Sequence, residues 1–341
     1  MFNLKKLVRP NILFLKPYSS ARDEFKGTEG VFLDANENPF GTLNRYPDSY
    51  QKELKDKLSG YKNIPTKNIF IGNGSDEIMD LIVRVFCNPG IDKALTFTPT
   101  FGMYQVVADI NNIQLIKLPL NDNFQINTEN LKAYLNDENL KVVFICSPNN
   151  PTGNCFIPKD VKFILNNFKG ITVIDEAYID FSNKATWFKT LESHPNLIVT
   201  QTFSKAWALA SARVGIAFAS EEIVQLLNKV KMPYNISKLN QQAAIDALDK
   251  QSVFEKNIEI ILKEKGLLIQ KLKQLDSVKK IYPSDANFLL VEFDDANKIY
   301  NELVEQKIIT RNRHKLVRNC IRITVGTPSE NQQLLNALKN I

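Results

Sequence analysis

Hydrophobic residues in this sequence follow two alternating patterns. Compact apolar runs, rich in β-branched and aromatic residues, occupy residues 141–148, 171–177, 197–203 and 214–220. Between such runs the apolar residues recur at the spacing of a helix, as at Ile78, Leu81, Ile82 and Val85. Nearly continuous apolar strands separated by helical segments are typical of a parallel sheet covered on both faces. The pattern therefore predicts an α/β fold with a mostly parallel sheet.

The pattern changes from about residue 236. A long helical stretch, residues 237–275, leads into apolar runs at residues 286–293 and 320–326. We therefore predict a large domain over residues 33–235 and a smaller α+β domain over residues 236–341. The segment 1–32, rich in proline and lysine, is grouped with the smaller domain as an N-terminal arm.

Composition excludes several classes of function. The 341 residues carry a net charge of +6 without long charged blocks or an aromatic-interleaved basic patch, which argues against nucleic acid. No apolar run reaches membrane-spanning length. Four scattered cysteines without a CxxC pair, and only two histidines, argue against disulfides, metal sites and histidine triads. We expect a cytoplasmic protein without a metal.

Polar residues with complementary chemistry follow three of the predicted strands. Asn150 follows the first, Asp175 ends the second, and Ser204 and Lys205 follow the third. Parallel strands bring their carboxyl ends to one sheet edge, where such folds bind ligands. A lysine can form a Schiff base with an aldehyde, a carboxylate can keep a pyridine nitrogen protonated, and a serine with Arg213 can hold a phosphate. Together these requirements describe pyridoxal phosphate.

Each of these residues also has a structural interpretation. Asp175 alone could cap a helix, and the segment SPNNPTG, residues 147–153, could be only a turn. In the same segment the Ser147–Pro148 and Asn150–Pro151 bonds are candidates for cis peptides. The functional interpretation depends on all of these residues meeting at one place.

Several longer motifs carry a family resemblance. They are LKPYSSARDEF, LDANENPFG, RYPD, GNGSDEIMDLIVR, TPTFGMY, SPNNPTGN, IDEAYIDF, TFSKA and CIRITVGTPSEN, in this order along nearly the whole chain. With them the sequence resembles the fold-type I aminotransferases, which depend on pyridoxal phosphate, and within them the histidinol-phosphate aminotransferase family. Two departures are Ala208 and Ser211, where that family commonly has glycine.

The resemblance implies roles around the cofactor ring. Lys205 would bind the cofactor and move the proton, and Asp175 would pair with the pyridinium nitrogen. Asn150 and Tyr178 would bind the phenolic oxygen. Tyr104 would stack on the ring, which adds about 0.5–1.5 kcal/mol beyond area burial.

The resemblance also implies a phosphate site and a dimer. Ser204, Arg213 and the backbone amides around Ser75 and Asp76 would hold the cofactor phosphate. Tyr46 would reach the same phosphate from a neighbouring subunit, which implies a homodimer with shared active sites.

On the substrate side, the resemblance assigns four residues. Arg322 would bind the α-carboxylate of glutamate and serve the phosphate of histidinol phosphate in the other half-reaction, since a guanidinium fork suits both anions. Arg311 would lie near the substrate phosphate, although a solvated charge is an alternative in the basic run RNRHK. Tyr18 and Asn36 would line the pocket from the N-terminal segment.

The implied reaction is a step of histidine biosynthesis. L-Histidinol phosphate and 2-oxoglutarate would be converted into imidazole-acetol phosphate and L-glutamate by a ping-pong mechanism. The alternatives are a lyase that decarboxylates threonine phosphate, or a broader aromatic or aspartate aminotransferase. A non-catalytic regulator is disfavoured because it would need an added DNA-binding domain.

Overall fold

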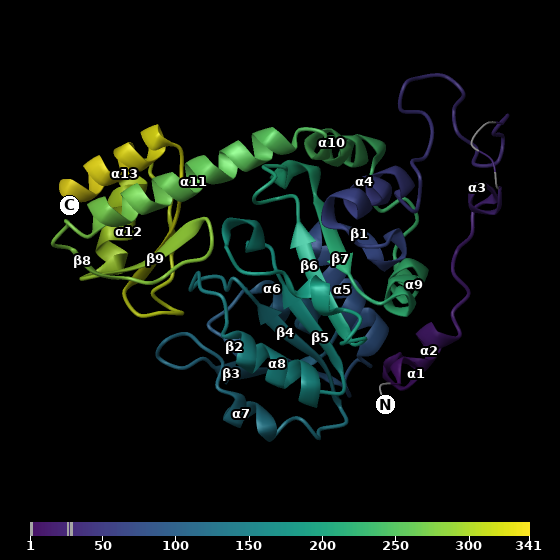
Figure 1. Ribbon diagram of the computed structural model, residues 1–341, viewed down its shortest axis with the longest axis horizontal. Helices are drawn as coiled ribbons and strands as arrows, with labels where there is room; N and C mark the ends of the chain where they lie inside the picture. Colours follow the sequence, from purple (N-terminus) through teal and green to yellow (C-terminus); the bar gives the residue numbers. More distant parts are fainter. Residues whose placement is uncertain (1–2, 26, 28–29) are drawn as a thin grey trace.

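The computed structural model describes residues 3–25, 27 and 30–341. Its larger body is built on a seven-stranded sheet in the order β1-β7-β6-β5-β4-β2-β3 (Figure 1). The strands are β1 (Ile69–Asn73), β2 (Lys93–Thr98), β3 (Gln114–Pro119), β4 (Leu140–Cys146), β5 (Ile171–Asp175), β6 (Leu197–Thr202) and β7 (Val214–Phe218). The prediction of a mostly parallel sheet is confirmed, with β7 antiparallel to both of its neighbours. Because β7 is antiparallel to both β1 and β6, these two neighbours of β7 run in the same direction. The strands β1, β4, β5 and β6 therefore all end at the same edge of the sheet.

Helices cover both faces of this sheet, as the apolar strands predicted. In β4, Val142 and Phe144 pack into one core and Val143 and Ile145 into the other, following the period-2 alternation of a strand. The first core is closed by α5 (Gly74–Phe86), α6 (Met103–Ile110) and α9 (Glu221–Val230). The second is closed by α4 (Lys52–Lys62), α7 (Thr128–Lys132), α8 (Pro158–Asn167) and α10 (Lys238–Leu248). Short 3-10 turns are η1 (Thr66–Asn68), η2 (Ile179–Phe181), η3 (Trp187–Thr190) and η4 (Ala210–Ala212).

The smaller body confirms the predicted α+β character. An antiparallel sheet in the order β10-β11-β9-β8 packs against three helices around a core of its own. The strands are β8 (Val278–Ile281), β9 (Phe288–Phe293), β10 (Arg311–Asn312) and β11 (Cys320–Thr324). The helices are α11 (Gln251–Leu272), α12 (Ala296–Glu305) and α13 (Pro328–Lys339).

The predicted helical stretch 237–275 is divided into two helices, α10 and α11. Ile245 of α10 and Phe254 in the first turn of α11 pack into a core of the larger body, whereas Leu268 and Leu272 pack into the smaller one. The change between cores thus lies within α11. A domain boundary at residue 236 stays a prediction.

The described residues of the N-terminal arm pack against the larger body, whereas the sequence pattern grouped the arm with the smaller one. It contains α1 (Leu4–Leu7), α2 (Pro10–Leu13) and α3 (Ala21–Glu24). Val8 and Ile12 are buried against α5, and the Arg9 backbone N–H donates to the Val85 carbonyl at 3.0 Å. Residues 1, 2, 26, 28 and 29 of this segment lie outside the described residues. No helix in the described part is long and apolar enough to cross a membrane.

Candidate active site

A cavity of about 130 Å³ opens at the edge where β1, β4, β5 and β6 end. The sequence-predicted residues that line it are Ser75, Asp76, Asn150, Asp175, Tyr178, Ser204, Lys205 and Arg213. They come from segments up to 138 positions apart between Ser75 and Arg213, so the fold and not the local sequence brings them together.

Lys205 enters this cavity from the turn that follows β6. Its Nζ lies 5.8 Å from the centre of the Tyr178 ring. Burial, followed by the nearby charge of Arg322, lowers the pKa of Lys205 below its ordinary value. A lowered pKa increases the share of neutral amine, the form that attacks an aldehyde or accepts a proton.

Asp175 is the buried last residue of β5. Its carboxylate accepts hydrogen bonds from the Tyr104 hydroxyl at 3.0 Å, from the Ala177 backbone N–H at 3.1 Å and from the Thr200 hydroxyl at 3.4 Å. Burial raises the pKa of Asp175 to about 6. Within the described residues it forms no ion pair, so a cation placed at this carboxylate would lower that pKa again.

Tyr104 does not have the position that the resemblance implied. It is fully buried, its ring stacks on Phe144 with centroids 4.9 Å apart, and its hydroxyl donates to Asp175. Of the two aromatic residues in this motif, Phe101 lines the cavity, and it meets Tyr104 edge-on at 5.7 Å. Tyr104 is therefore a positioning residue for Asp175. The motif TPTFGMY contains both aromatics, and its sequence does not reveal which one faces the cavity.

The N-terminus of α5 closes the end of the cavity that carries Ser75. The Arg213 guanidinium lies over this first turn and forms an ion pair with Asp76 at 3.1 Å. Gly215 of β7 lies so close that a Cβ there would be 2.5 Å from the Ser75 nitrogen. This glycine lets the strand lie directly against exposed helix N–H groups, an arrangement that suits a phosphate.

Asn150 connects the cavity with the smaller body. The Arg322 guanidinium of β11 donates to the Asn150 side-chain oxygen at 2.5 Å and lies 5.3 Å from the centre of the Phe288 ring. Arg311 is exposed and is the direct partner of Arg322 in the β10–β11 ladder. The Ser147–Pro148 and Asn150–Pro151 bonds are both cis, as predicted.

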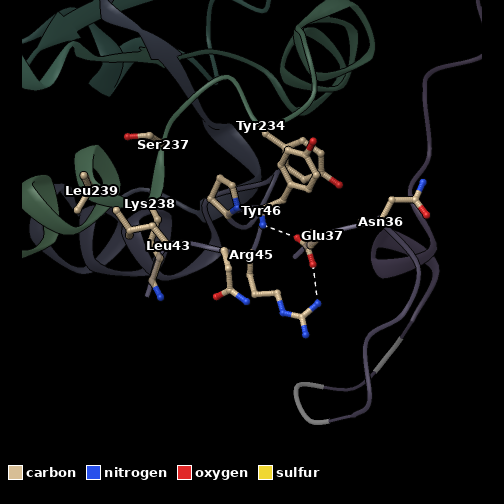
Figure 2. Close-up of a pocket in the computed structure, with 12 residues that line it drawn as sticks. Asn36, Glu37, Leu43, Arg45, Tyr46, Tyr234, Ser237, Lys238 and Leu239 are labelled. Atoms are coloured by element: carbon tan, nitrogen blue, oxygen red, sulfur yellow. Dashed lines mark hydrogen bonds and ion pairs between the residues drawn. The ribbon is translucent and has the colours of Figure 1, made fainter. Parts of the chain in front are cut away.

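Tyr46, Asn36 and Tyr18 lie away from this cavity. Tyr46 and Asn36 line a separate pocket of about 460 Å³. Figure 2 shows Tyr46 stacked on Tyr234, at 4.5 Å between centroids, with Glu37 accepting the Tyr46 backbone N–H. Tyr18 is 67% exposed on the arm. Within one chain the structure does not bring these three residues to Lys205.

Ala208 explains one departure from the family pattern. It has a left-handed backbone with φ of 56°, and its N–H donates to the Lys205 carbonyl at 3.2 Å. Glycine adopts this conformation without a steric penalty, which accounts for its use by the family at this position. The alanine keeps the turn, and nothing in the structure gives Ser211 a comparable role.

The cavity fits pyridoxal phosphate by the chemistry of its donors. A lysine amine, a buried carboxyl without a cationic partner among the described residues, and an aromatic face are arranged around one space. A helix N-terminus beside an arginine lies at one end. These are the groups needed to hold an aldehyde, a pyridinium ring and a phosphate.

Comparisons with known proteins agree with this geometry. The family described as aminotransferase class I and II matches residues 24–338. A histidinol-phosphate aminotransferase of Cytophaga hutchinsonii is 50% identical over 345 residues, covering 99% of each chain. One of Parabacteroides distasonis is 50% identical over 344 residues, covering 100% of this chain and 99% of that one. The crystal structure of a histidinol-phosphate aminotransferase from Sinorhizobium meliloti with pyridoxal 5′-phosphate has a TM-score of 0.78 at 25% identity, covering 87% of this chain and 83% of that one.

Proposed function

Because the chain belongs to the class I and II aminotransferase family, we propose that it transfers an amino group between L-histidinol phosphate and 2-oxoglutarate. The products are imidazole-acetol phosphate and L-glutamate, and both half-reactions would use the one cofactor site at Lys205. The observation that carries the proposal is the 50% identity, over the whole chain, to proteins described as histidinol-phosphate aminotransferases. Threonine-phosphate decarboxylation and a broader aminotransferase activity are not favoured by these relatives.

Pyridoxal phosphate, when bound, supplies an aldehyde for amines and a ring that withdraws electrons from the reacting carbon. Lys205 is the amine that holds this group and, when free, accepts and returns the proton at the reacting carbon. Its lowered pKa favours the neutral form needed for both tasks. Tyr178, whose ring faces the lysine, would bind the phenolic oxygen together with Asn150.

Asp175 would hold the ring nitrogen in its protonated form, because its buried carboxylate has no cationic partner among the described residues. Tyr104 fixes the orientation of that carboxylate. Ser204, Arg213 and the amides of Ser75 and Asp76 would hold the cofactor phosphate. Phe101, which lines the cavity, would have the stacking role that the resemblance implied for Tyr104.

Arg322 binds the anionic group of each substrate in this proposal. It reaches the cavity through Asn150, and Arg311 lies beside it in the ladder. Water is restricted on this side by Tyr178 and Phe288, whose rings meet edge-on at 5.1 Å.

We also propose a homodimer with shared active sites. The segment before α4 exposes large apolar side chains that water would solvate poorly: Phe14, Tyr18, Val31, Leu33, Phe40 and Leu43. This segment runs along the outside of the molecule beyond α9 (Figure 1). In a two-fold assembly it would carry Tyr46, Asn36 and Tyr18 to the partner's cavity. Sedimentation should then give twice the mass of one chain, and a single-chain mass would overturn this proposal.

A cytoplasmic location completes the proposal. All four cysteines are free thiols in the structure, which fits a reducing compartment.

Absorbance spectroscopy of the cofactor-loaded protein tests the proposed reaction. L-Histidinol phosphate should remove the visible band of the lysine-bound cofactor, and 2-oxoglutarate should restore it. The Lys205→Ala variant should lack the band. If glutamate or aromatic amino acids remove the band and histidinol phosphate does not, the substrate assignment is wrong while the cofactor assignment stands.

A further inference from the structure

Three arginines share one face of the smaller sheet. Arg311 and Arg322 are direct partners across the β10–β11 ladder, so their side chains project from the same face. The Arg313 backbone N–H donates to the Cys320 carbonyl at 2.9 Å and extends this ladder past β10. Because side chains alternate between the two faces along an extended chain, Arg313 lies on the same face of the sheet as Arg311. Asn312 lies on the opposite face, where its side-chain amide donates a hydrogen bond to the side-chain oxygen of Asn297 of α12 at 2.8 Å.

An acid on this face, Glu292 of β9, lies opposite Cys320 and accepts the Tyr282 hydroxyl at 3.0 Å. Among the ion pairs formed within the described residues, none involves Arg311, Arg313 or Arg322. The Nε atoms of Arg313 and Arg322 are buried and have no hydrogen-bond partner there. Burial, followed by the charges of Arg322 and Arg311, lowers the pKa of Arg313 to about 10. Three neighbouring cations with unused donors constitute a site for an anion of more than one charge.

The two amino donors of the proposed reaction differ in that anion. Glutamate carries its α-carboxylate directly on the reacting carbon, with a single charge. Histidinol phosphate carries its phosphate through a methylene and an oxygen, two bonds further out. A phosphate monoester has about −1.5 to −2 charges near pH 7 and three acceptor oxygens. The Arg322 guanidinium, which lies beside Asn150, suffices for the carboxylate. The phosphate needs a second guanidinium further along the same face of the sheet.

We propose that Arg313 is a specificity-determining residue, which binds the substrate phosphate beside Arg322 and favours the phosphorylated amine over glutamate. This inference rests on the proposed function. Arg313 is half-buried, whereas Arg311 is exposed, so the Arg313 side chain is less free to move in water than that of Arg311. A planar guanidinium can donate two parallel hydrogen bonds to phosphate oxygens.

The test compares both half-reactions of the cofactor-loaded enzyme by the absorbance of the bound cofactor. Arg313→Gln should raise the half-saturating concentration of histidinol phosphate by about 10- to 100-fold, the effect of losing one charge-assisted hydrogen-bond pair. The same value for glutamate should change by less than about 3-fold. Arg313→Lys should recover part of the loss. Arg318→Gln removes an equal charge from an exposed position in the same loop between β10 and β11. It should leave the half-saturating concentrations of both histidinol phosphate and glutamate unchanged.

Two outcomes overturn the inference: an equal loss for both donors in Arg313→Gln, or no loss for either. The substrates of the wild-type enzyme show whether the proposed function itself has failed or only the role of Arg313. If it reacts with glutamate and not with histidinol phosphate, the proposed substrate is wrong. Inhibition of the glutamate half-reaction by inorganic phosphate then decides the role of Arg313. Weaker inhibition in Arg313→Gln than in Arg318→Gln supports it, and equal inhibition overturns it. The cofactor band and the unfolding midpoint of each variant verify that it folds.

Discussion

Replacing Gly215 by alanine should damage the phosphate end of the cavity through steric contact alone. Gly215 of β7 is paired with Gly72 of β1, and its ordinary backbone would accept alanine. The added Cβ would lie 2.5 Å from the Ser75 nitrogen and 2.7 Å from the Gly74 oxygen, both backbone atoms of the first turn of α5. Ordinary contact at 3.4 Å or more requires that turn to move by about 1 Å, which a packed core resists.

Both stability and cofactor binding should respond. Overpacking of this kind costs about 1–3 kcal/mol of unfolding free energy. Moving the Ser75 N–H away from the phosphate removes a hydrogen bond to a charged group, so cofactor affinity should fall about 10- to 100-fold for each bond lost. Urea unfolding of the cofactor-free protein and a spectroscopic titration with pyridoxal phosphate measure the two effects separately.

Gly266→Ala provides the matched control. Gly266 lies within α11, and apart from the backbone of its own helix no atom of the described residues lies within 4 Å of the position of an added Cβ. This change should stabilise the protein by up to about 1 kcal/mol, the difference in helix propensity. The steric argument is refuted if Gly215→Ala binds the cofactor and unfolds like the wild type. It is also refuted if Gly266→Ala lowers the stability equally.

Three further variants test other features of the site. Asp175→Asn removes the charge that we propose for the ring nitrogen, and kcat of either half-reaction should fall about 10²- to 10³-fold; an unchanged kcat would exclude Asp175 from that role. Burial raises the pKa of Glu176 from 4.5 to about 7, so the folded state binds the proton more tightly and stability falls as pH rises from 4.5 to 7. Glu176→Gln should reduce this fall by roughly 3 kcal/mol in urea unfolding at a series of pH values, and a difference independent of pH would contradict it. Ala208→Gly should relieve the left-handed strain and raise stability by up to about 1 kcal/mol, which thermal unfolding can measure against Gly60→Ala in the exposed part of α4.

The local pattern of residues was sufficient to predict the main elements of the larger body. The apolar runs at β4, β5, β6 and β7 became strands because such runs can be buried on both sides, and the helical spacing of α5 could serve only a helix. Asn150, Asp175 and Lys205 were then expected at one edge, because each ends or follows a strand of the same sheet. This much of the site depends only on residues near the strand ends.

Positions that depend on contacts between distant segments were less predictable. Tyr104 and Phe101 are three positions apart, and burial against Phe144, which belongs to another strand, decides which one reaches the cavity. The division of the long helical stretch into α10 and α11 likewise reflects packing on two different cores.

Periodicity and nearby residues are therefore enough to predict the strands, the helices and the chemistry at the strand ends. Which side chains share a space depends instead on how distant segments fold together. The arginine face depends on the pairing of Arg311 with Arg322, and the approach of Gly215 to Ser75 depends on β7 lying beside β1. Strand register is set by contacts between distant segments, and a shift of one residue would send every side chain to the other face.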